Sequence, residues 1–263
     1  MKISVVTPSF NSQATIAATI RSFLAQDHRD KEMLVIDGGS SDATLAIARE
    51  FASPLIGIVS EKDRGVYDAM NKGLKLYGGD AVGFLNANDT FHDARSLSRI
   101  AQALEAAEAV HGGVRMVADR RTGRTLRFWK GEPFEPGKFR RGWMPPHPSF
   151  YIRRSLADRT GQFDLSYDIA ADYDFMLRAL EFHAASTACI SEALVDFTVG
   201  GKSSGSLIKV LKGNLECLRS RRANLGAPLL DWAFFLKPGL KLLRQHWALR
   251  NLRTAIARLT QPV

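Results

Sequence analysis

The chain has 263 residues, 45% of them hydrophobic, a composition that excludes a disordered or fibrous protein and can bury the core of one large domain, with or without an extension. No stretch of eighteen apolar residues occurs, residues 2–6 are strand-like rather than part of a signal sequence, and Cys189 and Cys217 are too isolated for a disulfide framework, so we expect a cytoplasmic protein. The net charge is +9, but residues 1–201 carry −1, because twelve basic residues lie from Lys202 onward against Glu216 and Asp231.

The first 85 residues alternate between strand and helix patterns. Short β-branched runs predict four strands, at 3–7, 32–36, 56–60 and 81–85. Helical periodicity predicts three intervening helices, at 14–26, 42–51 and 66–76. This order is typical of βαβ units, and it predicts an α/β fold with helices on both faces of the sheet. The polar turn after each strand should lie at the carboxyl edge of the sheet, where such folds bind ligands.

The second part of the chain has a less regular pattern. A helix is predicted over 94–110 and a hairpin over 114–129, with its turn at Thr122-Gly123. Residues 131–148 are rich in Pro, Gly and basic side chains and predict a surface loop, followed by a strand at 149–152. The loop carries Trp143 and His147, which could grip a substrate or belong to an ordinary exposed connection.

Three acidic clusters could carry chemistry. The turn from Asp37 to Asp42 has two glycines that allow close approach of a ligand, but it could equally be a turn with a helix N-cap. It lacks the Gly-x-Gly-x-x-Gly dinucleotide spacing. Asn86-Ala87-Asn88-Asp89 follows the fourth strand and could hold a metal ion or form a simple turn. Asp172 and Asp174 open a helix, where acids also favour the helix dipole.

Five motifs in order resemble the family 2 glycosyltransferases of GT-A fold. They are Val5-Val6-Thr7-Pro8-Ser9-Phe10-Asn11, Val35 to Thr44, Ser60 to Gly73, Leu85 to Asp89, and Ala171 to Phe175. The Asp63-to-Gly73 run and Pro145 to Phe150 are similar to those of bacterial enzymes of exopolysaccharide, colanic-acid-like and lipopolysaccharide assembly. The resemblance implies a mixed GT-A sheet and an inverting, metal-dependent transfer from a nucleotide-sugar to a saccharide or polyprenyl-linked saccharide.

The resemblance also implies the residues that bind the donor, a UDP-, GDP- or dTDP-sugar. The nucleoside would be bound by Thr7, Phe10, Asn11, Asp37 and Asp42. The sugar and diphosphate would be bound by Asp63, Arg64 and Asp68. We further expect Lys202, in a glycine-rich segment, to close over the diphosphate, although this segment could be a flexible link.

The metal and catalytic residues depart from the family pattern. The metal motif of the family is Asp-x-Asp with a further Asp, and here Asn86 and Asn88 replace two acids, which leaves Asp89 as the full charge for Mg²⁺ or Mn²⁺. The resemblance makes Asp172 the general base, with Ala171 in place of the usual preceding acid. His147, Trp143 and Asp174 are candidate acceptor residues. These departures leave open a nucleotide-sugar-binding protein without turnover.

The C-terminal segment is basic and amphipathic, and it predicts about three helices broken at 226–228 and 237–239. Cations beside Leu, Phe and Trp suit an anionic membrane surface, so we expect a protein peripheral to the inner face of the cell membrane. The alternative is that these helices pack on the protein. The acidic sheet edge argues against nucleic acid as a partner. We expect a catalytic domain over 1–205, with a donor half (1–90) and an acceptor half (91–205), and a tail over 206–263.

Overall fold

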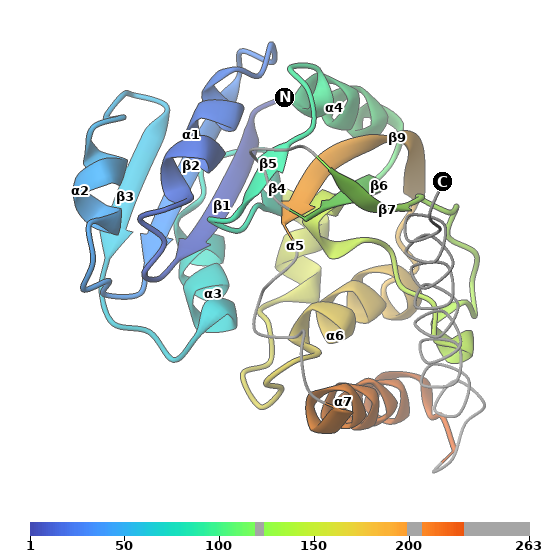
Figure 1. Cartoon of the computed structure of the whole chain (residues 1–263). Coiled ribbons are helices and arrows are strands. Elements are labelled where there is room, and N and C mark those ends of the chain that lie inside the picture. The colour runs from blue at the N-terminus through green and yellow to red at the C-terminus, as the bar shows by residue number, and fades with distance from the viewer. Residues whose placement is uncertain (119–123, 199–206, 229–263) are drawn as a thin grey trace, which may run out of the picture.

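Residues 1–118, 124–198 and 207–228 are described by the computed structural model. The N-terminal half contains four parallel strands in the order β3-β2-β1-β4 (Figure 1). The strands are β1 (Ile3–Ser9), β2 (Lys31–Asp37), β3 (Ile56–Ser60) and β4 (Ala81–Phe84). The helices that connect them are α1 (Ile16–Leu24), α2 (Thr44–Arg49) and α3 (Val66–Leu76). The predicted βαβ succession is confirmed in this half.

Helices cover both faces of the sheet, as predicted. On one face, α1 buries Ile16, Ile20 and Phe23, whose spacing places them on one side of the helix, against β1 and β2. On the other face, α3 lies so close to β1 that a Cβ on Gly73 would come within 2.3 Å of Cγ1 of Val6. Glycine at this position therefore permits the close contact between α3 and the sheet.

The other half makes the sheet mixed, as the resemblance implied. Beyond β4 the order continues as β8, β6, β9 and β5, and β7 pairs with β6 as the predicted hairpin. These strands are β5 (Asp89–Phe91), β6 (Ala109–Val117), β7 (Thr125–Trp129), β8 (Tyr151–Arg153) and β9 (Thr187–Thr198). Strand β8 is antiparallel to β4 and to β6, whereas β9 is parallel to β6.

Several element boundaries differ from the prediction. The helix predicted over 94–110 is α4 (Ser96–Ala106), which ends early because Ala109 already belongs to β6. The predicted loop contains short 3-10 turns at Phe139–Arg141 and His147–Ser149. No sequence pattern predicted β5, which has three residues, or β9, whose buried and exposed positions do not alternate.

The chain continues through three helices that cover one face of the second half of the sheet. These are α5 (Arg154–Thr160), α6 (Ala171–Leu177), which a π-helical turn (Arg178–Phe182) extends, and α7 (Leu207–Leu225). Figure 1 shows α7 beside α6, and Cys217 of α7 joins the same core as Phe175 of α6. Helix α7 thus packs on the preceding part of the chain, although it lies beyond the boundary predicted at residue 205.

The remainder of the predicted tail, residues 229–263, lies outside the described residues, as does Lys202. Within the described ranges, none of the helices is both long enough and apolar enough to span a membrane.

Candidate functional site

The carboxyl ends of β1, β2 and β4 bring the predicted turns together at one edge of the sheet. The strand register pairs Ser9 with Asp37 and Val6 with Phe84, so the chain leaves all three strands near the same edge. The hydroxyls of Thr7 and Ser9 are buried and have no hydrogen-bond partner in the described part of the chain. Phe10, by contrast, is 56% exposed and offers its ring to a ligand.

The Asp37 carboxylate organises its own turn. It accepts hydrogen bonds from the hydroxyls of Ser40 and Ser60 and from the backbone N–H groups of Gly39 and Ser40. Burial alone would raise the pKa of Asp37, but these hydrogen bonds outweigh it and lower the pKa. Asp37 is therefore ionised and buried at the carboxyl end of β2, with its charge held by the turn.

Asn11 and Asp42 join the first two turns. The side-chain oxygen of Asn11, a residue with a positive φ of 46°, accepts the N–H of Ser41 at 3.0 Å. Asp42 accepts the N–H groups of Thr44 at 2.9 Å and Gln13 at 3.1 Å. Both side chains thus fix the two turns relative to each other, and Asp42 also accepts from Thr44, the first residue of α2.

The third turn leads into α3. Asp63 accepts the N–H of Gly65 at 2.8 Å, and its carboxylate lies so close to Gly38 that a Cβ there would be 2.4 Å from Asp63 Oδ2. Asp68 accepts the backbone N–H of Arg64 at 3.0 Å, and the Arg64 side chain is 77% exposed. The sequence thus correctly placed these three residues at the edge where β2 and β3 end.

The turn from Asn86 to Asp89 offers one carboxylate and two side-chain amides as candidate metal ligands. Asp89 is fully buried, and its carboxylate accepts the N–H of Thr198 at 3.1 Å and the amide of Asn86 at 3.2 Å. The Asn88 amide points to the carbonyl of Thr198 at 3.5 Å. In the described residues, no three His, Cys, Asp or Glu side chains form a group that could hold a metal ion.

Asp172 lies in the first turn of α6, and Phe175 of the same helix packs against Phe84 at the end of β4. Its Oδ1 accepts the N–H of Tyr173 at 2.8 Å and lies 3.4 Å from the hydroxyl of Tyr67, which donates to the carbonyl of Ile169 at 2.7 Å. Its Oδ2 has no hydrogen-bond partner within the described ranges. One carboxylate oxygen is therefore fixed and the other is available to a ligand.

His147 lies close to Asp172 and stacks on Phe84 of β4, with 6.1 Å between ring centroids. Burial lowers the pKa of His147, although the negative charge of Asp172 opposes this shift. The half-buried imidazole is thus neutral near pH 7, able to donate one hydrogen bond and accept another.

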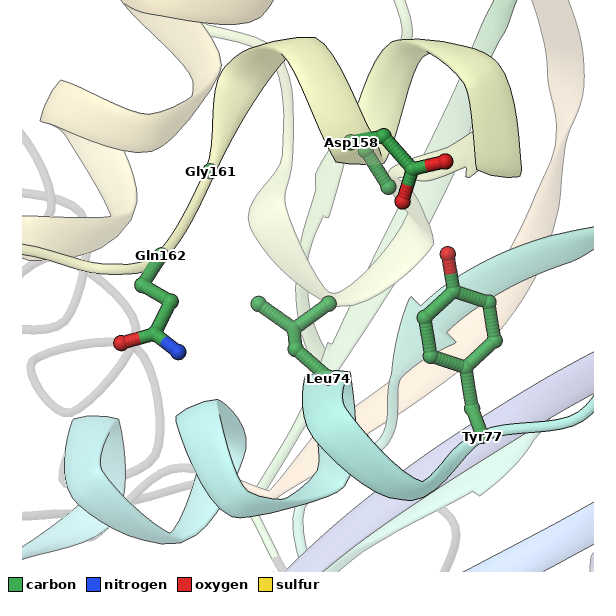
Figure 2. A pocket seen from close by; sticks show the side chains of 6 residues that line it. Leu74, Tyr77, Asp158, Gly161 and Gln162 are labelled. Atoms are coloured by element: carbon green, nitrogen blue, oxygen red, sulfur yellow. The ribbon is translucent and has the colours of Figure 1, made fainter.

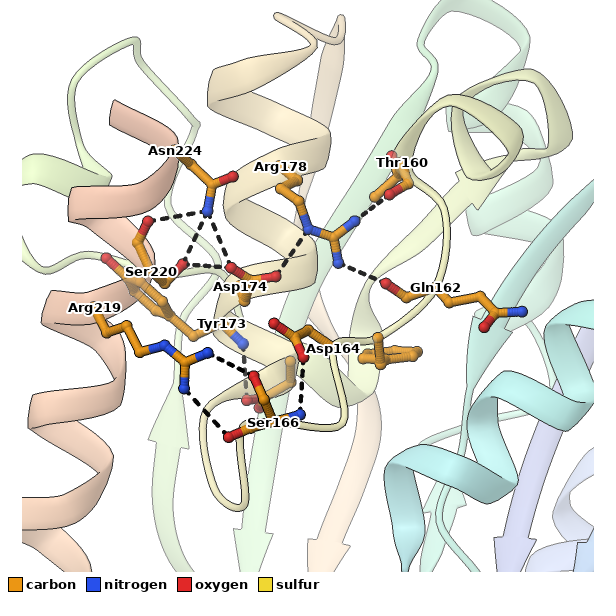
Figure 3. Close-up of polar contacts among 12 residues, drawn as sticks. Thr160, Gln162, Asp164, Ser166, Tyr173, Asp174, Arg178, Arg219, Ser220 and Asn224 are labelled. Atoms are coloured by element: carbon orange, nitrogen blue, oxygen red, sulfur yellow. Dashed lines mark hydrogen bonds and ion pairs between the residues drawn. The ribbon is translucent and has the colours of Figure 1, made fainter. Parts of the chain in front are cut away.

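The structure separates the other two acceptor candidates from Asp172. Asp174 is buried between α6 and α7, where it binds Arg178, Ser220 and Asn224 (Figure 3). Trp143 packs its ring against Phe134, Phe139 and His111. Because the Asp174 side chain faces α7, it is not placed to contact an acceptor. The ring contacts of Trp143 are those of a residue that packs within its loop.

A hollow lies away from these turns, between the end of α3 and α5 (Figure 2). Its lining includes Leu74 and Tyr77, at the opposite end of α3 from Asp68, together with Asp158 and Gln162. It therefore does not belong to the candidate site.

Sequence reasoning missed Tyr67 and Glu216, which contact the segment that carries Asp172. Tyr67 lies inside one of the five motifs, at the helical position before Asp68, and this position was the available signal. Glu216 is the acid within the basic helix α7 and accepts backbone N–H groups of residues 168–170. A single acid among basic residues gives no sign of such a contact.

Comparison with known sequences places this site in a family context. A family model described as glycosyl transferase family 2 matches residues 4–161. A PGL/p-HBAD biosynthesis glycosyltransferase of Mycobacterium bovis (strain BCG / Pasteur 1173P2) is 32% identical over 214 residues, which cover 78% of this chain and 80% of the relative. The succinoglycan biosynthesis protein ExoO of Rhizobium meliloti is 25% identical over 275 residues, covering 96% and 74%.

Solved structures share the fold. S. aureus TarS 1–349 in complex with UDP-GlcNAc superposes with a TM-score of 0.66 at 20% identity, covering 86% of this chain and 68% of that one. The mannosyltransferase PcManGT from Pyrobaculum calidifontis, in complex with GDP-Man and Mn²⁺, gives a TM-score of 0.62 at 18% identity, covering 100% and 76%. The predicted GT-A fold is thus confirmed.

Proposed function

Because this chain belongs to glycosyltransferase family 2, we propose that it transfers a sugar from a nucleotide-sugar to an acceptor hydroxyl with inversion at the anomeric carbon. The solved structures of this fold that hold UDP-GlcNAc and GDP-Man support a nucleotide-sugar donor. The donor would lie over the turns at Thr7, Asp37 and Asp63. Phe10 would contact the base, and Arg64 would face the diphosphate.

The arrangement at Asp172 is the observation that carries the proposal. The transfer requires removal of the proton from the acceptor hydroxyl as the new bond forms, and Asp172 Oδ2 would take it as general base. The Tyr173 N–H orients the carboxylate through Oδ1, and the Tyr67 hydroxyl, which donates to the Ile169 carbonyl, lies 3.4 Å from the same oxygen. Neutral His147, beside Asp172, would hydrogen-bond the acceptor sugar. Inversion follows from attack on the face opposite the departing diphosphate.

The residues at Asn86 to Asp89 fit a divalent cation that the donor completes. Asp89 supplies a buried carboxylate, and the side-chain amides of Asn86 and Asn88 lie in the same turn. Mg²⁺ commonly takes one or two carboxylates together with substrate phosphates and water. Asp89 would hold the ion, assisted by the amide oxygens of Asn86 and Asn88, and the ion would supply Lewis-acid stabilisation of the leaving diphosphate. We expect weak metal binding without the nucleotide.

The acceptor is proposed to be a saccharide on a lipid carrier, with the enzyme peripheral to the inner face of the membrane. Relatives named for PGL and succinoglycan biosynthesis support an acceptor in surface glycolipid or polysaccharide assembly. On α7, Ile208, Leu211 and Leu215 are 79%, 53% and 50% exposed. Exposed cations lie on the same helix, at Lys209, Arg219 and Arg222. Apolar side chains with cations suit an anionic lipid surface.

The deciding experiment compares Asp172→Asn with Asp168→Asn, a change of the exposed carboxylate four residues earlier. We expect Asp172→Asn to lower the transfer rate by about 10²- to 10⁴-fold with donor binding retained, and Asp168→Asn to remain near wild type. Near-wild-type transfer by Asp172→Asn would reject the assignment of the base. Full transfer in EDTA would reject the metal. Donor binding by wild type with neither transfer nor hydrolysis would support the nucleotide-sugar-binding alternative.

A further inference from the structure

Helix α7 supplies a buried carboxylate to the segment that leads into Asp172. Glu216 is 8% exposed, and its two oxygens accept three consecutive backbone N–H groups. Oε1 accepts the N–H of Asp168 at 3.2 Å, and Oε2 accepts those of Ile169 and Ala170, both at 2.9 Å. Ala170 directly precedes α6, whose start has no side-chain cap of its own. The carboxylate of Glu216 therefore satisfies N–H groups that the sequence next to α6 leaves without a partner.

The same segment is held from the other side by α3. The carbonyl of Ile169 accepts the hydroxyl of Tyr67 at 2.7 Å, and Tyr67 also approaches Asp172 Oδ1. The peptide at Ile169 is thus fixed at its N–H by α7 and at its carbonyl by α3. Asp172 follows three residues later, so the geometry of this segment sets where its carboxylate lies.

Glu216 acts on this segment separately from the docking of α7. Ser220 and Asn224 of α7 donate to Asp174 Oδ1 at 2.7 and 3.1 Å, and Arg178 binds Asp174 Oδ2 at 2.8 Å (Figure 3). Leu218 and Cys217 add buried apolar contacts. These anchors hold α7 on α6 without Glu216, so a change at Glu216 should release the segment 168–170 and leave the helix in place.

We propose that Glu216 is a positioning residue for the catalytic base: it holds residues 168–170 so that Asp172 Oδ2 faces the acceptor hydroxyl. This inference rests on the proposed function of Asp172. A base misplaced by about 1 Å can cost up to about 10²-fold in rate. Among the described residues, the Glu216 carboxylate hydrogen-bonds only the backbone of residues 168–170 and none of the donor turns on β1, β2 and β3. Loss of Glu216 should therefore lower kcat and spare donor binding.

The test uses Glu216→Ala, Glu216→Gln and the control Lys212→Ala in the full chain. Lys212 lies one turn before Glu216 and pairs with the exposed carboxylate of Asp168, so its loss removes a contact to the same segment at the surface. We expect kcat to fall about 10- to 100-fold in Glu216→Ala, and less in Glu216→Gln, which keeps one acceptor oxygen. Donor Kd should stay within about twofold in all three.

Amide hydrogen exchange of residues 168–172 gives a second measurement that does not depend on turnover. Exchange should accelerate in Glu216→Ala and remain at the wild-type rate in Lys212→Ala. Wild-type kcat in Glu216→Ala, or equal losses of kcat, donor affinity and Tm, would overturn the positioning role. An absence of transfer by the wild type would instead overturn the proposed function, whatever the exchange rates, and with it the catalytic part of this inference.

Discussion

Replacement of Asp174 by alanine should destabilise the fold far more than the loss of an ion pair at the surface. The Asp174 side chain is 5% exposed and receives a charged hydrogen bond from Arg178 and two neutral ones from Ser220 and Asn224. Alanine would leave two polar groups of α7 without their acceptor and would leave the guanidinium of Arg178, 17% exposed, without its counter-charge.

The expected loss follows from these contacts. Removing one partner of a buried ion pair typically costs about 3–5 kcal/mol. Arg178 keeps two acceptors, the carbonyls of Thr160 and Gln162, so the lower end of that range applies. We therefore expect the free energy of unfolding to fall by about 3 kcal/mol, which for a chain of this size lowers Tm by about 6–12 °C. Asp174→Asn, which can still accept from Ser220, should lose about half as much.

Urea denaturation followed by circular dichroism measures the change, with Arg159→Ala as the matched control. Arg159 pairs with Glu108 at 2.7 Å, but both side chains are largely accessible, at 45% and 32%, so its loss should cost less than about 1 kcal/mol. Equal destabilisation by Asp174→Ala and Arg159→Ala would refute a structural role for the Asp174 network. It would also reopen Asp174 as a residue that contacts the acceptor.

Three further changes test other parts of the molecule. Gly38→Ala would place a Cβ 2.4 Å from Asp63 Oδ2 and so displace that carboxylate. We expect nucleotide-sugar binding, measured by calorimetry, to weaken about tenfold, with a small change in Tm. Unchanged affinity would contradict the donor role of Asp63. Burial lowers the pKa of His111 to about 4, so the free energy of unfolding should fall by about 3 kcal/mol as the pH falls from 6.5 to 4, where only the unfolded chain binds the proton. In His111→Phe, the free energy of unfolding should depend less steeply on pH over this range. An identical pH dependence in the variant and the wild type would disprove this role of His111. Serine at Ile208, Leu211 and Leu215 should reduce sedimentation with anionic vesicles, and wild-type sedimentation should weaken with salt; unaltered sedimentation would exclude α7 as the membrane contact.

The sequence predicted the donor half well because local patterns determine it. The β-branched runs before Asp37 and Asp63 end in polar turns, and parallel strands bring such turns to one edge whatever the details of packing. The same logic placed the turns that carry Phe10 and Arg64 at this edge, where the structure exposes both side chains. What the pattern could not show is that Asp37 and Asp42 also bind their own turns, because hydrogen bonds to a turn and to a ligand require the same residue types.

The acceptor half was predicted less well because contacts distant in sequence define it. Asp172 and Asp174 are two residues apart on one short helix, and either could have faced the acceptor. The difference lies in Ser220 and Asn224, about fifty residues later, which bind Asp174 and turn it to α7. The basic composition after Lys202 indicated a separate tail, but Cys217 on the buried side of α7 packs in the same hydrophobic core as Phe175 of α6. Net charge describes a surface, and it carries no information on the side of a helix that is buried.

Helix α3 shows how one motif serves both halves. Its first turn carries Asp68, which fixes Arg64 at the donor edge. Four residues apart on another side of the helix, Tyr67 stacks on Phe163 at 5.7 Å, and Asn71 exchanges two hydrogen bonds with the backbone of Phe163, at 2.8 and 2.9 Å. Phe163 begins the segment that ends at Asp172. The motif that resembles a donor site therefore also fixes the distance between the donor turns and the proposed base, and this double use explains why polar residues such as Asn71 are buried there.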